Sequence, residues 1–227
     1  ELARMRLGRV PVYEELLHHV LAYITARHDC ADFLLLGIIR LLYQFRNHES
    51  LSSRFFSEAE RCVIDFKYHP SEPGVDSMCT WTENHAIMFA GSDYLAAQLH
   101  PDRTFTNTGE AGRARLGRAR ERVMRWLWMR FHTGFSEWLS HVYYDEDILA
   151  LLNLYDFAHD EEVRDAARSV LDLLFLDLAH GCFRGTLATS HGRSYSSEKR
   201  NPVAESVSDT IFLAFGRGSI TEHDNMS

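Results

Sequence analysis

The sequence predicts an all-α protein made of consecutive antiparallel helix pairs. Apolar residues recur every three or four positions in nearly every segment before His180, which is the period of an amphipathic helix. The 227 residues include only 5 prolines and 13 glycines, and the prolines fall between the periodic segments. Because many-turned β-folds need frequent turn residues, we expect no sheet larger than a small hairpin.

The first half of the chain contains four predicted helices. Two of them, Pro11 to Arg27 and Ala31 to Arg46, form the first pair. The third begins at Ser57 or an earlier serine and runs through Phe66. A loop at Tyr68 to Cys79 separates it from the fourth, which spans about Glu83 to Leu99. On the first helix, the residues expected to face the core are Val12, Leu16, Leu17, Val20 and Tyr23 or Ile24.

An arginine-rich segment predicts the next helix. It spans Arg113 to Arg130 after a polar connector at Thr106 to Ala111, and Gly134 stands where a left-handed cap usually ends a helix. The arginines alternate with apolar residues, and the chain carries a net charge of −8. We therefore interpret them as a solvated helix face and expect no nucleic-acid partner. The residues expected to form the core stripe of this helix are Leu116, Val123, Leu127 and Phe131.

The clearest helix pair comes next, at Asp145 to Ala158 and Asp160 to Leu178, with Asp160 as a strong N-cap. The helical pattern then ends, and small, polar and basic residues predict an irregular loop over residues 180–203. Ser206 to Phe215 forms a final short helix or strand. The total is about seven or eight helices. No break in composition divides them, so we expect a single helical domain over residues 1–227.

The spacing of the helix pairs limits the architecture. Each pair spans about 45 to 50 residues, but no motif repeats within the pairs, which argues against tetratricopeptide and ankyrin arrays. An α/α-toroid or an irregular helical solenoid fits better. A complete toroid needs more helices than the sequence provides, so we expect part of a ring or a fragment of a larger toroid.

The cysteines and the apolar runs exclude several classes of protein. Cys30, Cys62, Cys79 and Cys182 are far apart and form no C-x-x-C pair, so neither a dense disulfide framework nor a structural zinc site is expected. Isolated disulfides stay an open alternative. We predict no metal and no cofactor. No apolar run is long enough to cross a bilayer, so we expect no membrane partner. The sequence leaves self-association undecided.

Three segments hold more polar and aromatic groups than their positions require. The first is Trp81 to His85, at a junction between a loop and a helix. Capping explains Thr82 and Glu83 but leaves the other residues unexplained. We hypothesise that Glu83, Asn84 and His85 project into a cleft beside Trp81, whose ring suits stacking against a sugar.

The second segment is Phe135 to Tyr144, again just before a helix. Glu137, His141, Tyr143 and Tyr144 offer acid, base and hydrogen-bonding groups. The alternative is that the tyrosines are packing residues whose hydroxyl groups have partners. Both interpretations stay open at this point.

The third segment is Ser190 to Tyr195, with Lys199 close behind. His191, Arg193, Tyr195 and Lys199 supply donors in a glycine-containing loop, a common place for ligand contacts. A mobile, solvated loop has the same composition. Because this loop interrupts an otherwise helical chain, we favour a substrate-binding role.

These segments carry a resemblance to known proteins. The stretches WTENHAIMFAGSDYLAAQLHPD, FSEWLSHVYYDEDILALLNLYDFA and SHGRSY resemble a group of largely uncharacterised proteins. Those proteins are similar in turn to the α/α-toroid polysaccharide lyases, the heparinase II/III-like and alginate-lyase-like enzymes. The resemblance covers roughly Asp76 to Gly216. Its clearest element is Asn84-His85, which resembles the N-H motif on an inner toroid helix of these lyases.

The resemblance implies β-elimination on a uronate polymer. Asn84 would neutralise the uronate carboxylate, His85 would remove the proton from the adjacent carbon, and Arg193 would clamp the carboxylate through its planar fork. Two departures stand against it: Glu83 places a negative charge beside Asn84, and the β-rich second domain of these enzymes is absent from the sequence. The residues implied as the acid that protonates the departing oxygen are Tyr143, Tyr144 or Tyr195.

Two other functions remain alternatives. A glycoside hydrolase on the same scaffold would use Glu83 and Glu137 as acid and base, separated by about 6.5–9.5 Å in an inverting enzyme. A non-catalytic binding or scaffold protein would scatter its polar residues outward. The expected partner is a polysaccharide or an oligosaccharide, and this interpretation favours an extracellular location over others that the sequence leaves undecided.

Overall fold

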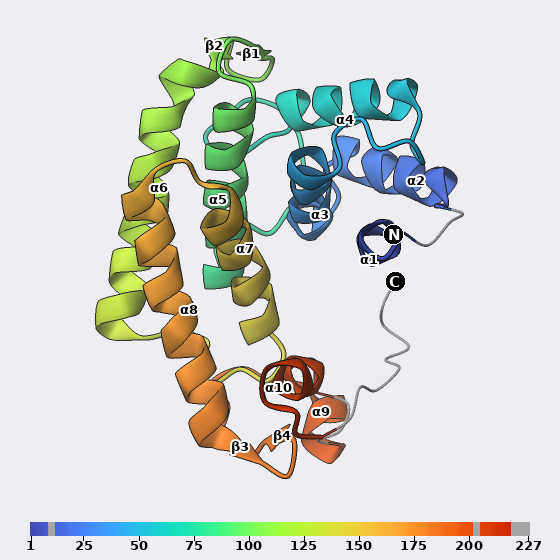
Figure 1. Ribbon diagram of the computed structural model, residues 1–227. Coiled ribbons are helices and arrows are strands. Elements are labelled where there is room, and N and C mark those ends of the chain that lie inside the picture. Colours follow the sequence, from blue (N-terminus) through green and yellow to red (C-terminus); the bar gives the residue numbers. More distant parts are fainter. Residues whose placement is uncertain (9–11, 202–204, 219–227) are drawn as a thin grey trace.

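The computed structural model of the chain describes residues 1–8, 12–201 and 205–218, and within them it is almost entirely helical (Figure 1). The predicted start of the first helix at Pro11 and the end of the loop at 202–203 lie outside the described residues. Two two-stranded antiparallel hairpins complete the secondary structure there. This confirms the all-α prediction. The helices and strands are α1 (Leu2–Arg6), α2 (Glu14–Thr25), α3 (Ala31–Gln44), α4 (Ser53–Asp65), α5 (Glu83–Leu99), β1 (Thr104–Phe105), β2 (Glu110–Ala111), α6 (Gly112–Thr133), α7 (Tyr144–Phe157), α8 (Glu161–Gly181), β3 (Cys182–Phe183), β4 (Thr186–Leu187), α9 (Ser196–Arg200) and α10 (Val207–Phe215).

Two helix hairpins, α5–α6 and α7–α8, lie side by side (Figure 1). Trp126 near the end of α6 donates its indole N–H to the carbonyl of Glu83 at the start of α5, at 2.9 Å. Tyr144 at the start of α7 bonds Asp177 near the end of α8. The start of each first helix therefore meets the end of its partner, so both hairpins are antiparallel, as predicted.

A third helix, α3, packs against both α5 and α7 and runs parallel to them. At one end, Asp32 contacts His85. Towards the other end, the Tyr43 hydroxyl donates to the carbonyl of Leu95, and Arg40 bonds Asp156. Because the three helices run in the same direction, their N-terminal ends lie together. This arrangement puts residues 32, 83–85 and 144–147 at the same end of the three-helix group.

The predicted helix ends agree with the structure wherever a cap supplies the signal. Ser52 accepts the backbone N–H of Phe55, so α4 begins at one of the earlier serines. Asp160 accepts the N–H groups of Glu162 and Val163 at the start of α8. Gly134 follows α6 with φ +75°, a conformation that favours glycine.

Two predicted core faces were partly wrong. On α2, Leu16 is 54% exposed, and the buried stripe consists of Leu17, Leu21 and Ile24 instead. On α6, Phe131 is 52% exposed because the helix turns that face to solvent near its end. The predicted solvated arginine face was also wrong in part. Arg115 and Arg130 are buried and ion-paired, because α6 packs its arginines against carboxylates of neighbouring elements.

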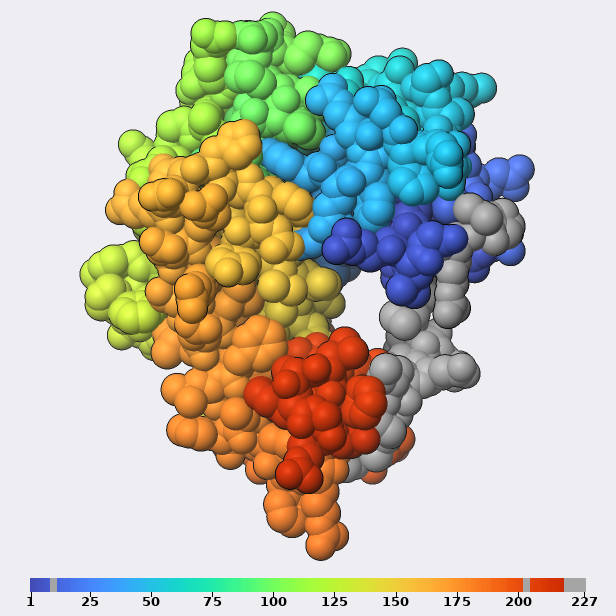
Figure 2. All heavy atoms as spheres, viewed as in Figure 1, coloured from blue at the N-terminus to red at the C-terminus, as the bar shows by residue number. Residues whose placement is uncertain are grey.

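The segment predicted as an irregular loop contains small elements. Helix α8 continues to Gly181, the β3–β4 hairpin follows, and α9 begins at Ser196. The final element, α10, is a helix that packs against α7, α8 and β4; its red surface adjoins the orange surface of α8 (Figure 2). All four cysteines fall within the described residues and are unpaired thiols. None of the described helices has the length and apolar character needed to span a bilayer.

Candidate functional site

Glu83 anchors the connection between α6 and α7 to the start of α5. Its carboxylate accepts the guanidinium of Arg130 and the backbone N–H groups of Ser136, at 2.7 Å, and Glu137. Arg130 also donates to the Ser136 hydroxyl at 3.0 Å. These donors use the lone pairs of Glu83, so this predicted site residue holds the segment that carries Glu137.

Asn84 and His85 are buried on α5. Thr82 donates its hydroxyl to Asn84 Oδ1 at 2.5 Å, whereas Asn84 Nδ2 is buried and has no hydrogen-bond partner. His85 is 6% exposed, and its Nδ1 lies 2.6 Å from Oδ2 of the fully buried Asp32. Burial raises the pKa of Asp32, although the contact with His85 opposes that shift. Trp81 is 81% exposed, so it does not share one exposed surface with these two residues.

Four other predicted residues form a connected group that we call the tyrosine–arginine cluster: Glu137, Tyr143, Arg193 and Tyr195. Arg193 donates Nη1–H to Glu137 at 2.6 Å and Nη2–H to the Tyr195 hydroxyl at 2.8 Å. Its guanidinium carbon lies 4.2 Å from the centroid of the Tyr143 ring. The hydroxyl groups of Tyr143 and Tyr195 are 2.5 Å apart. Because Tyr195 is 43% exposed, solvent reaches this cluster.

The surroundings of Tyr143 and Arg193 keep both side chains protonated. Burial raises the pKa of Tyr143, and the hydrogen bond with Tyr195 raises it further, so the hydroxyl keeps its proton at neutral pH. Burial opposes the charge of Arg193, but its hydrogen bond to Glu137 and its contact with Tyr143 raise its pKa on balance. Behind the cluster, burial raises the pKa of Asp147 well above its usual range, with Glu83 and Glu137 adding to the shift.

Backbone contacts between residues 138–139 and 191–192 hold the cluster together. Gly192 donates its N–H to the carbonyl of Trp138 at 2.7 Å, and a Cβ at Gly192 would lie 2.9 Å from the Trp138 nitrogen. Leu139 has φ +47°, a rare conformation for a branched residue, and its carbonyl lies 2.7 Å from Nδ1 of His191. Only glycine fits the close approach, which explains the glycine in the SHGRSY segment.

The remaining predicted site residues lie outside the cluster. Tyr144 is buried; its hydroxyl donates to Asp177 at 3.1 Å and accepts the N–H of Leu139, so its role is packing. Lys199 is exposed on α9. His191 stacks on His141, with ring centroids 3.9 Å apart.

Three acidic residues near the N-terminal ends of α3 and α7 were not predicted from the sequence as site residues. Asp32, Glu146 and Asp147 lie in the first turns of α3 and α7. Acidic residues are common in the first turn of a helix, and only the parallel packing of α3, α5 and α7 brings these three to the same end. A carboxylate inside the apolar run from Ala31 to Leu36 was the available signal for Asp32.

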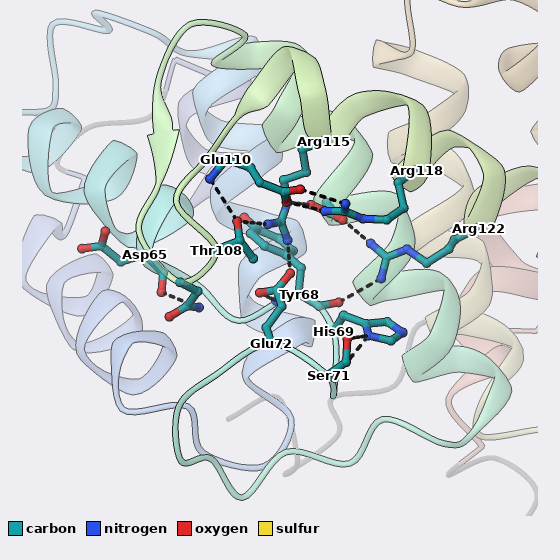
Figure 3. A network of polar contacts seen from close by, with 12 residues as sticks. Asp65, Tyr68, His69, Ser71, Glu72, Thr108, Glu110, Arg115, Arg118 and Arg122 are labelled. Carbon is teal, nitrogen blue, oxygen red and sulfur yellow. Dashed lines mark hydrogen bonds and ion pairs between the residues drawn. The ribbon is translucent and has the colours of Figure 1, made fainter.

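The larger surface cavities lie elsewhere. One of about 1020 Å³ is lined by residues of α2 and α4, including Arg54, Glu58 and Arg61. A second, of about 580 Å³, lies beside an arginine-rich network of α6 and is lined by His69 and Arg122 among others (Figure 3). Neither is lined by the tyrosine–arginine cluster.

No family model, curated protein or solved structure matches this chain.

Proposed function

We propose that this chain acts on an acidic carbohydrate, a uronate-containing polymer, and cleaves it by β-elimination at the tyrosine–arginine cluster. The observation that carries the proposal is the hydroxyl pair of Tyr143 and Tyr195, 2.5 Å apart, with the Arg193 guanidinium donating to one of them. A retained phenolic proton beside a planar cation suits a substrate that has a carboxylate and a departing oxygen.

Each group has a role in this proposal. Arg193 pairs with the uronate carboxylate, sharing its donors between the substrate and Glu137. Tyr143, whose raised pKa preserves its proton, protonates the departing glycosidic oxygen. His85 is the base: Asp32 holds Nδ1, which leaves Nε2 to accept the proton from carbon. The unpartnered amide of Asn84 supplies a hydrogen bond to the carboxylate as negative charge develops.

The proposal also covers the arrangement of the helices. The hairpins α5–α6 and α7–α8, with α3 packed on the first helix of each, form an arc of an α/α-toroid whose inner helices begin at the substrate end. Sites on helical scaffolds gather where several helix ends meet, and the N-terminal ends add a positive potential that favours an anionic substrate.

Hydrolysis is a weaker proposal on the same scaffold. A general acid must reach the substrate with a free carboxyl oxygen, but the carboxylate of Glu83 already accepts Arg130 and two backbone N–H groups. Glu83 therefore suits an anchor better than an acid.

The test is turnover on a panel of uronate polymers, followed by ultraviolet absorbance of the unsaturated product. Tyr143→Phe should lower kcat by about 10²- to 10⁴-fold, because the general acid is lost. Tyr155→Phe, an exposed tyrosine of α7, is the matched control and should keep full activity. A reducing end without unsaturation would indicate the hydrolase. Binding without turnover, or neither, would indicate the scaffold protein.

A further inference from the structure

A second group of side chains lies beside the tyrosine–arginine cluster and has no role in the proposed reaction. His141, His191 and Glu205 come from the connection before α7, the loop after β4 and the residues before α10. One ligand atom from each lies within 4.8 Å of the others. His141 and Glu205 are buried and His191 is half-buried. Three segments distant in sequence thus bring metal-ligating groups to one point.

Each imidazole has one ring nitrogen within hydrogen-bond distance of a neighbouring group. Nδ1 of His191 lies 2.7 Å from the carbonyl of Leu139; it must donate there, which leaves Nε2 with a lone pair. Nδ1 of His141 lies 3.0 Å from Oε1 of Glu205, and its Nε2 is buried without a hydrogen-bond partner. A carbonyl on the other ring nitrogen is the usual way in which a metal-binding histidine is oriented, and His191 follows it. The two rings stack with an interplanar angle of 23°, so one of them has to rotate for both in-plane lone pairs to reach the same ion.

The charges at this point favour a cation. Glu205 is buried, and its partners among the described residues are the N–H of Leu187, at 3.2 Å, and His141. The carboxylate of Glu198 lies close enough to His141 for the two to interact electrostatically. A buried carboxylate is costly unless its charge is compensated, and a divalent ion would compensate it.

We propose that His141, His191 and Glu205 bind a divalent transition metal of the zinc type. Two imidazole nitrogens and a carboxylate oxygen suit zinc better than calcium or magnesium, which prefer oxygen ligands alone. Binding needs no net proton transfer from His141: its proton moves from Nδ1 to the unpartnered Nε2 when the ion replaces the hydrogen bond to Glu205. Three protein ligands leave a fourth position open to water or an anion. The proposal does not depend on the carbohydrate activity.

The test is titration of the chelator-treated full chain with ZnCl₂ in a calorimeter, together with CoCl₂ and its visible d–d spectrum. We expect one equivalent to bind and a tetrahedral cobalt spectrum. His191→Ala should weaken binding by about 10–100-fold or more, because a direct ligand is lost. Glu205→Gln should also weaken it, while its amide oxygen still accepts the Leu187 N–H.

Two controls separate this site from other ligands in the chain. His180→Ala removes an exposed histidine of α8 and should leave the affinity unchanged. A Cys30→Ser/Cys79→Ser variant removes two thiols and should bind equally well. Circular dichroism checks that each variant folds; because His191 is only half-buried, its variant is expected to do so. Absence of stoichiometric binding, or equal affinity in folded His191→Ala and Glu205→Gln, would overturn the proposal.

Discussion

Two polar clusters contact α5, one near its middle and one at its start. They differ in how their charged side chains are paired. In the first, which we call the arginine network, the buried guanidinium of Arg115 bonds Asp93 and Glu72, and Arg122 bonds the other oxygen of Asp93 (Figure 3). In the second, the tyrosine–arginine cluster, one cation meets one carboxylate and two hydroxyl groups at a solvent-exposed edge.

This difference identifies the arginine network as structural and the tyrosine–arginine cluster as a candidate functional site. In the arginine network, Arg115 lies against the rings of Tyr68 and Phe105 and ties α6 to α5 and to the loop before it. In the tyrosine–arginine cluster, by contrast, Tyr195 is 43% exposed, so solvent and a ligand can reach its polar groups. Each cluster leaves one buried polar atom without a hydrogen-bond partner, Nε of Arg122 in the first and Oε2 of Glu137 in the second, so exposure is the feature that distinguishes the candidate site.

The largest expected effect is on stability, at the arginine network. Arg115→Ala leaves Glu72 and Asp93 buried with less compensation, so we expect it to lower the free energy of unfolding by about 3–5 kcal/mol. Urea denaturation followed by circular dichroism measures the change.

Arg118→Ala is the matched control for that experiment. Arg118 lies one turn further along α6 and pairs with Glu110 at the surface, so its loss should cost only about 0–1 kcal/mol. Similar losses in the two variants would contradict the distinction between buried and exposed pairs.

The second prediction concerns the pH dependence of stability at the site end. Burial raises the pKa of Glu146 from 4.5 to about 7, and the nearby charges of Asp145 and Asp32 add to the shift. The folded chain therefore holds this proton more tightly than the unfolded chain. Its contribution to stability is complete below pH 4.5 and disappears as the pH rises to about 7, a loss of at most about 3 kcal/mol.

Glu146→Gln removes this titration. The variant should be more stable than the wild type at pH 8, and its stability should change less between pH 4.5 and 7. Thermal unfolding across that range measures both effects. Parallel curves for the two proteins would show that Glu146 ionises at its ordinary pKa.

The sequence predicted the helices well because their signals are local. The limits of α3 and α5 follow from apolar periodicity and from the residues that stop a helix, and Asp160 acts as the predicted cap. Gly134 ends α6 with a positive φ, but its ψ of −166° is not that of the predicted left-handed cap. The burial of Arg115 could not be predicted in this way. Its partners Glu72 and Asp93 are distant in sequence, so only the packing of the helices shows that its charge is compensated.

The candidate site was predictable as a set of residues but not as an arrangement. Arg193, Tyr143 and Tyr195 were chosen because polar groups accumulate in their segments, and the structure brings them into contact. Asn84 and His85 were chosen because helix capping leaves them unexplained, and the resemblance gave them roles. Their burial could not be inferred from their position at the start of a helix. Helix periodicity shows which residues share a face, but not which helix covers it.

The smallest expected effect on stability belongs to Trp81. Its side chain is 81% exposed, so Trp81→Ala should change the free energy of unfolding by less than about 0.5 kcal/mol. The same variant should bind uronate oligosaccharides more weakly if the indole stacks against a sugar ring, and Trp128→Ala, another exposed tryptophan, on α6, should not. Calorimetry on both variants with one oligosaccharide separates the two cases. Equal affinity in wild type and Trp81→Ala would remove Trp81 from the proposed substrate surface. A large loss of stability would instead contradict the exposed position of the Trp81 side chain.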